Sequence, residues 1–240
     1  GGLRAKPGEV SLAHNGVLFL DELPEFTPQV LDSLRQPLES GETAIARANY
    51  RVTFPSRFQL IGAMNPCRCG MAGEPGHTCR RGERCMSDYQ QRISGPFMDR
   101  IDIRVEVPAI TASDMLNMKP AEDSASVAKR VLKARTIQAS RLEQITSNPS
   151  INSTLKIGNG FNNASASASL IEHIAIMDEG ASDLIKDAAE KMKFSARAYH
   201  RILKVARTIA DLEDQDKIGR THLAEAIGYR AINSRLNAAA

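Results

Sequence analysis

Two short apolar runs, each followed by polar residues, stand out in the first half of the chain. Val17–Leu20 are consecutive apolar residues that lead directly into Asp21 and Glu22. Because this run does not alternate with polar residues, it predicts a strand buried on both faces, as in a central parallel strand. A second run, within residues 57–64, predicts another buried strand, and Asn65 stands at its carboxyl end.

The segment between the two runs predicts a helix. Thr27 is a good N-cap, Pro28 is a good first helical residue, and Gly41 is a suitable C-terminal stop. The apolar residues between them recur at helical spacing, namely Val30, Leu31, Leu34 and Leu38. Pro37 conflicts with a continuous helix, so the pattern predicts a kink or an end near Gln36.

Residues 42–54 change to a strand-like pattern and predict a β-hairpin with Asn49 in its turn. Two basic residues, Arg47 and Arg51, lie near the predicted tip. They could contact a substrate, and a solvated turn explains them equally well.

The second half of the chain has helical spacing. Val127, Val131, Ala134 and Leu142 share one face of a helix that begins near residue 126, and basic residues lie mostly on its other faces. A solvated face explains such residues more often than a nucleic-acid surface does. The Asn- and Ser-rich residues 147–169 predict a loop around a short helix.

Three further helices are predicted to begin at the capping residues Ser182, Ser195 and Thr221. Arg197 falls in the first turn of the longest of them, where a cation is unfavourable for the helix dipole. A local rule broken in this way indicates that the charge faces an anionic group.

Composition and charge narrow the class of protein. The chain has 240 residues, 42% hydrophobic and 25% charged, which is typical of a globular protein. A net charge of +3 is too small to indicate a nucleic-acid partner by itself. No apolar run approaches the ~20 residues of a membrane span, and the first residues do not form a signal peptide. We therefore expect a cytoplasmic protein with no membrane partner, in which disulfides are unfavoured.

Asp21 and Glu22 stand where open α/β sheets bind ligands, at the end of a parallel strand. This pattern is typical of a Walker B motif, in which Asp21 would hold Mg²⁺ and Glu22 would orient a water for attack on a γ-phosphate. The alternative is a strand whose terminal carboxylates are merely solvated. Asn65 could reach the same water if the two strands are neighbours; otherwise it starts an Asn-Pro turn.

Arg100 directly precedes residues 101–107, whose alternating pattern predicts a strand ended by Pro108. An arginine at such a junction can act as an arginine finger, which stabilises charge on a phosphate held by a neighbouring subunit. The alternative is an ion pair with Asp99 or Asp102.

All four cysteines lie in one window that is rich in Gly, Pro and Arg: Cys67, Cys69, Cys79 and Cys85. The surroundings are too polar for a core, so packing does not explain the cluster. Four thiolates could close a tetrahedral Zn²⁺ site that orders the loop. The C-x-C…C-x₅-C spacing is not a common zinc spacing, and free thiols or redox chemistry are the alternatives.

Several motifs together resemble the magnesium-chelatase-like AAA+ ATPases of bacteria, the YifB/ComM family. The amino-terminal ones are residues 16–26 (GVLFLDELPEF), 65–70 (NPCRCG) and 94–102 (SGPFMDRID). Residues 203–212 (LKVARTIADL) and 222–230 (HLAEAIGYR) match the family's carboxyl end. The resemblance covers nearly the whole chain apart from the Asn- and Ser-rich loop.

The resemblance implies an α/β fold with two domains. Residues 1–108 would form a partial AAA+ P-loop-type core, a parallel sheet with helices. Residues 109–120 would be a linker, and residues 121–240 an all-α helical lid. The hairpin would be an insert that points toward the central pore of a ring.

The resemblance also implies roles for particular residues. They are Walker B for Asp21 and Glu22, sensor 1 for Asn65, arginine finger for Arg100 and sensor 2 for Arg197. The cofactors would be ATP and Mg²⁺, with Zn²⁺ in the cysteine loop. Family members form hexamer-like rings, and competence members act on DNA as branch-migration helicases. Relatives in magnesium chelatase drive metal insertion into porphyrin instead.

One departure from the family is the absence of a G-x-x-x-x-G-K-[ST] phosphate-binding loop from the 240 residues. In the family this loop lies upstream of the position of Gly1, so the chain resembles the part that follows Walker A. We therefore expect core strands to be missing, and expect ATPase activity of the full-length protein but not of this chain alone. The alternatives are a chelatase-type subunit and a non-enzymatic, zinc-stabilised interaction module.

Overall fold

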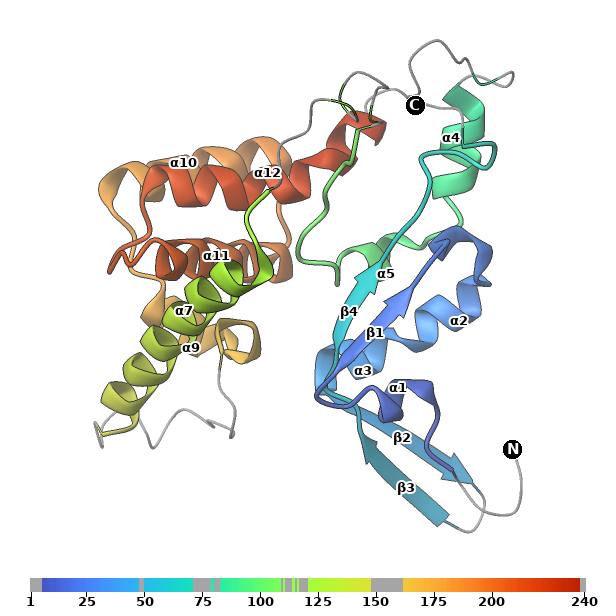
Figure 1. Ribbon diagram of the computed structural model, residues 1–240, viewed down its shortest axis with the longest axis horizontal. Coiled ribbons are helices and arrows are strands. Elements are labelled where there is room, and N and C mark those ends of the chain that lie inside the picture. Colours follow the sequence, from blue (N-terminus) through green and yellow to red (C-terminus); the bar gives the residue numbers. More distant parts are fainter. Residues whose placement is uncertain are drawn as a thin grey trace. The chain divides into compact units, whose positions relative to one another are not determined.

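The computed structural model divides the chain into two compact units (Figure 1). Unit 1 comprises residues 1–101 and 107–110, and unit 2 comprises residues 102–106 and 111–240. The structure describes residues 6–47, 50–70, 79, 83–108, 110, 114, 116, 121–147 and 162–237.

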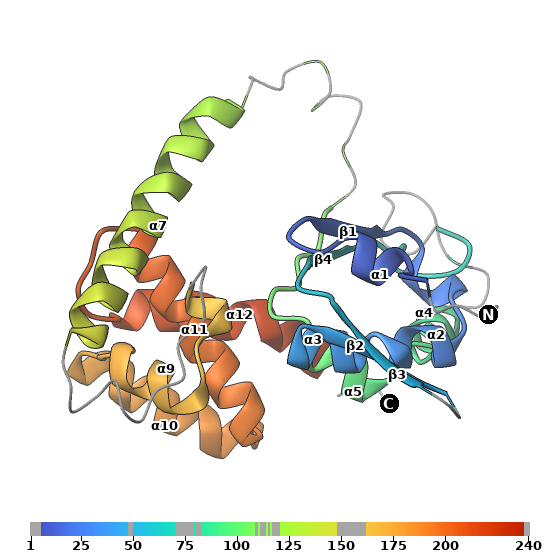
Figure 2. The same cartoon turned by 90° about the horizontal axis from the view of Figure 1, so that it is seen from below.

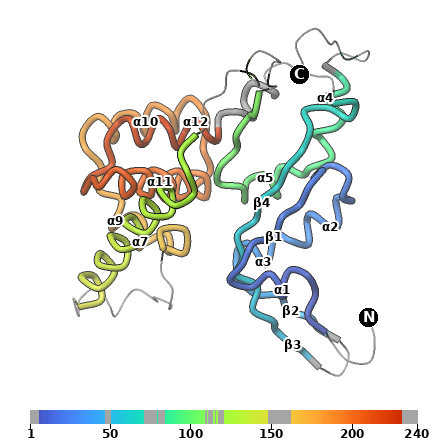
Figure 3. Tube along the Cα trace, viewed as in Figure 1, coloured from blue at the N-terminus to red at the C-terminus, as the bar shows by residue number. Residues whose placement is uncertain are grey.

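Unit 1 is built on a parallel pair of strands, β1 (Val17–Leu20) and β4 (Gln59–Gly62), which run side by side in the trace of Figure 3. Val17 is paired with Gln59 and Leu20 with Gly62. The accompanying helices are α1 (Glu9–Leu12), η1 (Leu23–Glu25), α2 (Pro28–Ser33), α3 (Arg35–Ser40), α4 (Glu83–Gln90) and α5 (Gly95–Met98). The expected α/β class, with a parallel sheet and helices, is confirmed.

The prediction that β1 is buried on both faces is wrong. Leu18 and Leu20 pack against the unit 1 core, which contains Leu31 and Phe97 among its buried residues. The side chains of Val17 and Phe19, on the other face, are 53% and 59% exposed. Within the described residues, the helices of unit 1 therefore leave these two side chains uncovered.

The predicted single helix is divided into α2 and α3 at Leu34, two residues before the predicted position. Pro37 is the third residue of α3, where a backbone N–H has no acceptor within the helix, so its missing donor is tolerated. Thr27 precedes α2 but makes no capping hydrogen bond with its side chain. Gly41 ends α3 with a positive φ of 70°, as expected for a glycine stop.

The predicted hairpin is present. β2 (Glu42–Arg47) pairs antiparallel with β3 (Tyr50–Pro55), and Asn49 lies outside the described residues. Figure 1 shows the hairpin on the side of unit 1 where β1 begins, away from the carboxyl ends of the parallel strands.

Residues 101–107 do not form the predicted strand. The alternating apolar side chains Ile103, Val105 and Val107 are 52%, 66% and 86% exposed. The backbone N–H of Arg104 does donate to the carbonyl of Tyr229, at 3.2 Å. Alternation alone was therefore a poor guide here, because a strand needs a ladder of such bonds with a partner.

The described part of unit 2 is mainly helical, with one isolated parallel β-bridge between Met177 and Ile218. Its core is centred on α11 (Ala196–Leu212). This helix contacts α7 (Ser124–Thr146), η2 (Asn163–Ser165), α9 (Ala168–Ile174) and α12 (Arg220–Asn237). Figure 2 shows α7, α9 and α12 beside it. α10 (Glu179–Met192) packs against α12. No helix among the described residues is long and apolar enough to cross a membrane.

Two of the three predicted helix starts in unit 2 are wrong. Ser195 caps α11 as predicted, since its hydroxyl accepts from the N–H of Ala198 at 3.2 Å. α10 is instead capped by Asp178, whose carboxylate accepts from the N–H of Ala181 at 2.7 Å. α10 begins before Ser182 because Asp178 is fixed by its backbone hydrogen bond to Ile218. α12 begins at Arg220, one residue before the predicted cap Thr221.

The predicted apolar face of α7 is only partly buried. Ala134 is buried, whereas the side chains of Val127 and Val131 are 37% and 47% exposed. Three of the basic residues on this helix are paired with acids, in the ion pairs Arg130–Glu122, Lys133–Asp214 and Arg141–Asp211. The basic character of α7 is thus largely balanced within unit 2.

A buried ionic network crosses the core of unit 2. Asp211 accepts hydrogen bonds from Arg207 Nε at 3.0 Å, from Asn163 Nδ2 at 2.7 Å and from Arg141 Nη1 at 3.2 Å. Arg207, which is fully buried, also donates to the carbonyls of Gln215 and Asp216. Burial lowers the pKa of the Arg207 guanidinium, and the charge of Asp211 opposes that shift.

We expect Asp211→Asn to destabilise the chain by about 3–5 kcal/mol, because it leaves the buried Arg207 without its anionic partner. The measurement is the free energy of unfolding in urea. Asp214→Asn is the control, since the exposed Asp214–Lys133 pair should contribute at most about 1 kcal/mol. Equal effects of the two substitutions would show that the network does not stabilise the fold.

Candidate functional site

The carboxyl ends of β1 and β4 meet at one edge of the sheet. Beyond the strands, the N–H of Ala63 donates to the carbonyl of Leu20 at 2.9 Å, and the N–H of Leu23 donates to the carbonyl of Ala63 at 3.1 Å. Asp21 and Glu22 are therefore held between two bonds to the chain that leads to Asn65. The condition under which these side chains could act together, that their strands are neighbours, is met.

Glu22 has a left-handed backbone conformation, with φ 52° and ψ 48°. Its N–H donates to Asp21 Oδ1 at 2.8 Å, and both carboxylates are exposed. A non-glycine residue in this region is held there at a cost of about 1–3 kcal/mol, and such residues cluster at functional sites. The strand end thus presents two carboxylates to solvent on a constrained turn.

Leu23 anchors this turn in the core of unit 1, where it is 7% exposed. Gly62, the last residue of β4, makes room for it. A Cβ atom at Gly62 would lie 2.5 Å from Leu23 Cδ1 and 3.1 Å from Leu23 Cγ. The glycine therefore lets the turn after β1 pack directly on β4.

Arg100 is 7% exposed and belongs to unit 1. Its guanidinium forms an ion pair with Glu39 of α3 at 2.9 Å and donates to the carbonyl of Pro96. The alternative partner Asp102 forms an ion pair with Arg201. The structure therefore gives Arg100 a partner on a helix that sequence reasoning did not consider.

Arg197 lies in unit 2, at the second residue of α11, and it is exposed. Its predicted place in the first turn of this helix is correct. Its role toward an anionic group stays a prediction.

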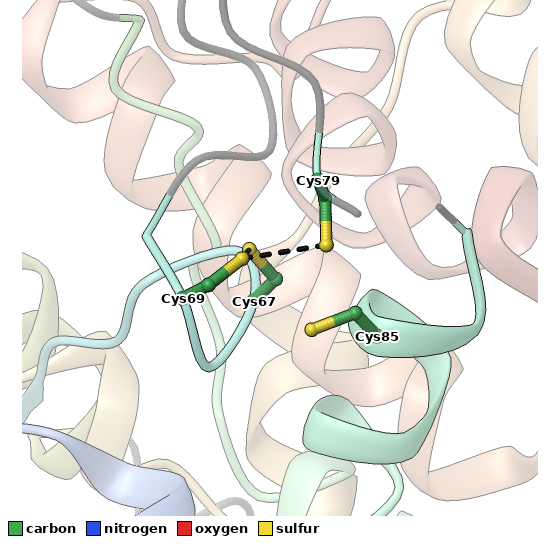
Figure 4. Close-up of side chains that lie close together, drawn as sticks. All are labelled: Cys67, Cys69, Cys79 and Cys85. Carbon is green, nitrogen blue, oxygen red and sulfur yellow. Dashed lines mark hydrogen bonds between the residues drawn. The ribbon is translucent and has the colours of Figure 1, made fainter. Parts of the chain in front are cut away.

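The four cysteine sulfurs converge (Figure 4). All four Sγ atoms lie within 4.8 Å of one another, with 3.2 Å between Cys67 and Cys69 and 3.3 Å between Cys69 and Cys79. These separations exceed the ~2.05 Å of a disulfide bond. They are close to the ~3.8 Å between sulfurs that a tetrahedral ion with 2.3 Å Zn–S bonds requires. The cluster, completed by Cys85, is thus a set of thiolate donors that could hold a metal ion.

Sequence reasoning missed two residues near the turn that follows Glu22. They are Tyr89 of α4 and Arg92, which lies just after α4. Arg92 Nη1 donates to the carbonyl of Pro24 at 3.3 Å and forms an ion pair with Glu25 at 3.4 Å. Tyr89 is 4% exposed, and burial, followed by the charges of Glu25 and Glu22, raises the pKa of its hydroxyl. Their i, i+3 spacing indicated only that they could share a face of one helix.

We expect Gly62→Ala to lower the stability of the chain by about 1–3 kcal/mol, because the new methyl group displaces the buried Leu23. The measurement is the midpoint of thermal unfolding. Gly228→Ala is the control. Gly228 is exposed in α12, and no atom lies within 4 Å of the position that its added methyl group would take. Alanine should therefore stabilise the helix by up to about 1 kcal/mol. A midpoint that Gly62→Ala leaves unchanged would contradict the tight packing described.

Comparison with known proteins gives two family matches that are consecutive along the chain. "Magnesium chelatase, subunit ChlI" matches residues 1–115, and "Magnesium chelatase, subunit ChlI C-terminal" matches residues 121–230.

Several curated proteins are similar to the chain. Competence protein ComM of Haemophilus influenzae is 46% identical over 97% of this chain and 42% of ComM. The uncharacterized protein YifB of Escherichia coli is 40% identical over 98% of this chain and 43% of YifB. The magnesium-chelatase 67 kDa subunit of Heliobacterium mobile is 31% identical over 61% of this chain and 21% of that subunit. The chain spans less than half the length of ComM and YifB, and it belongs with them to the magnesium-chelatase-like AAA+ family.

Proposed function

We propose that this chain is part of an ATP-dependent AAA+ motor that remodels DNA, and that it carries the residues that act on the γ-phosphate. The observation that carries the proposal is the parallel pairing of β1 with β4, which brings Asp21 and Glu22 to the same sheet edge as Asn65. The similarity to ComM over nearly the whole chain supports this class of protein.

The donors at this edge fit a magnesium nucleotide. Asp21 and Glu22 offer exposed carboxylate oxygens, the donors that Mg²⁺ prefers. When bound, Mg²⁺–ATP would supply the γ-phosphate and a cation that neutralises its charge. Asp21 would hold the cation, Glu22 would accept a proton from the attacking water, and Asn65 would orient that water. The phosphate-binding loop is not among these 240 residues.

Two arginines would stabilise charge on phosphate. Arg197, exposed at the start of α11, would act as sensor 2. Arg100 would act as the arginine finger on a nucleotide held by the next subunit of a ring, which we propose to be a hexamer. To do so its guanidinium must exchange Glu39 for the phosphate.

DNA is the proposed substrate, and the β2–β3 hairpin is the element we expect to contact it. Arg51 is exposed on β3, opposite Ala46 of β2. The basic helix α7 is a weaker candidate because Arg130, Lys133 and Arg141 are paired with acids. A chelatase-type role is the second candidate, and the identity to the chelatase subunit is lower and covers less of the chain.

Zn²⁺ is the proposed metal of the cysteine cluster, because four converging thiolates favour a tetrahedral ion with soft ligands.

We expect purified chain to contain about one equivalent of zinc, and Cys85→Ser to lose most of it. Elemental analysis gives the zinc content, and Co²⁺ replacement should give a thiolate-to-cobalt charge-transfer band. Ser87→Ala, on the same helix, is the control. Less than about 0.1 equivalent in the unaltered chain would refute the zinc site.

We expect the full-length protein to hydrolyse ATP and Glu22→Gln to lower kcat by about 10²–10⁴-fold, because the amide cannot accept the proton of the attacking water. Steady-state ATPase assays measure this. The 240-residue chain alone should show no turnover, since it lacks the phosphate-binding loop.

Glu9→Gln, which alters an exposed carboxylate on α1, is the matched control and should leave kcat unchanged. Turnover by the isolated chain that Glu22→Gln abolishes would refute the predicted inactivity.

Branched DNA should stimulate the full-length ATPase. Stimulation by chelatase partner subunits instead, with none by DNA, would support the chelatase-type role.

A further inference from the structure

The cysteine cluster joins two elements that border the candidate catalytic edge. Cys67 and Cys69 follow Asn65 directly after β4, and Cys85 is the third residue of α4. The side chain of Gln90, at the other end of α4, donates to the carbonyl of Pro66 at 3.2 Å. A metal bound by the thiolates would therefore fix the first turn of α4 to the segment that carries Asn65, while Gln90 fixes its last turn.

α4 depends on such anchors. It has eight residues, and isolated helices shorter than about 12–15 residues are marginal in water. Cys67 is fully buried, so a cross-link through its sulfur would attach the helix to a fixed point of unit 1. The metal would supply order that the propensity of the helix cannot supply by itself.

Arg92, two residues beyond the end of α4, contacts the turn that follows Glu22. Arg92 binds both the carbonyl of Pro24 and the carboxylate of Glu25. The Arg92 guanidinium also lies 6.0 Å from the ring centre of Tyr89, which belongs to α4. These contacts connect α4 to η1, and η1 begins at the residue after Glu22.

We infer that the thiolate metal centre is a clamp on the catalytic edge: by fixing α4, it holds η1 through Arg92, and so holds Glu22 in its left-handed conformation. The inference rests on the zinc site proposed above. The consequence of the clamp for catalysis rests on the proposed role of Glu22 in ATP hydrolysis. Arg92 is a positioning residue in this arrangement, since it contacts Pro24 and Glu25 and not a substrate.

Hydrogen exchange of the unaltered 240-residue chain tests the clamp without nucleotide. The chain is stripped with a chelator and then reloaded with one equivalent of Zn²⁺. Reloading should slow the exchange of the amides of Leu23, Glu25 and Phe26 on the order of ten-fold. The amides of Glu25 and Phe26 donate to carbonyls within the turn that the clamp holds, and the amide of Leu23 joins that turn to the carbonyl of Ala63. Amides of the β2–β3 hairpin serve as the internal control and should not change.

Arg92→Gln isolates the connection from metal binding itself. This variant should bind zinc with the same stoichiometry, but zinc should no longer slow exchange at residues 23–26. Arg84→Gln, an exposed position on the same helix, is the matched control and should behave as the unaltered chain does.

Each outcome decides a different point. Zinc that binds without slowing exchange at residues 23–26 overturns the clamp, as does full protection in Arg92→Gln. A chain that binds no zinc overturns both the site and the clamp. Neither result depends on ATP hydrolysis, which Glu22→Gln tests separately. In the full-length protein, zinc removal should lower kcat more than it changes KM, and zinc should restore it.

Discussion

The parallel pairing of β1 with β4 is the constraint on which the candidate site depends. The ladder runs from the bond between Gln59 N–H and the Gly16 carbonyl, 2.9 Å, to the bonds of Ala63 beyond the strand ends. This register places the two carboxylates after β1 beside the chain that leads to Asn65. It also sets the close approach of Gly62 to Leu23, which buries the residue after Glu22. The strained backbone of Glu22 is therefore a consequence of two fixed neighbours, and not an isolated irregularity.

The same strand pair shows what an apolar run can and cannot predict. The run Val17–Leu20 indicated correctly that a parallel strand forms here, because all four residues suit a strand with both faces covered. It could not indicate whether the covering elements lie within these residues. The side chains of Leu18 and Leu20 pack against the core of unit 1, whereas those of Val17 and Phe19 stay more than half exposed among the described residues. The alternation in residues 101–107 failed for a related reason, since a period-two pattern describes one strand and says nothing about its partner.

Some local signals were reliable, whereas contacts between residues that are far apart in the sequence could not be predicted from them. The positive φ of Gly41 and the cap at Ser195 depend on a few adjacent residues, and the sequence was sufficient for both. The cap at Asp178 depends on a backbone bond to Ile218, forty residues away along the chain, so Ser182 was the wrong choice. The cysteine spacing matched no common zinc motif, yet the fold brings all four sulfurs together. Spacing rules describe thiols on one short loop, whereas Cys85 reaches the cluster from a helix.

The burial of Arg100 constrains the arginine-finger role that we propose for it in a ring of subunits. A guanidinium paired with Glu39 and the Pro96 carbonyl is not free to meet a phosphate, so a trans-acting role requires an exchange of partners. Glu39 favours such an exchange, because its side chain is 38% exposed and solvent weakens its hold on the arginine. A γ-phosphate carries more charge than one carboxylate and offers several acceptor oxygens, so it would compete well for the same guanidinium. Glu39 lies in the last turn of α3, three residues before Glu42, where the β2–β3 hairpin begins. Under the proposed function, the release of Glu39 would therefore affect the base of the β2–β3 hairpin, the element that we expect to contact DNA.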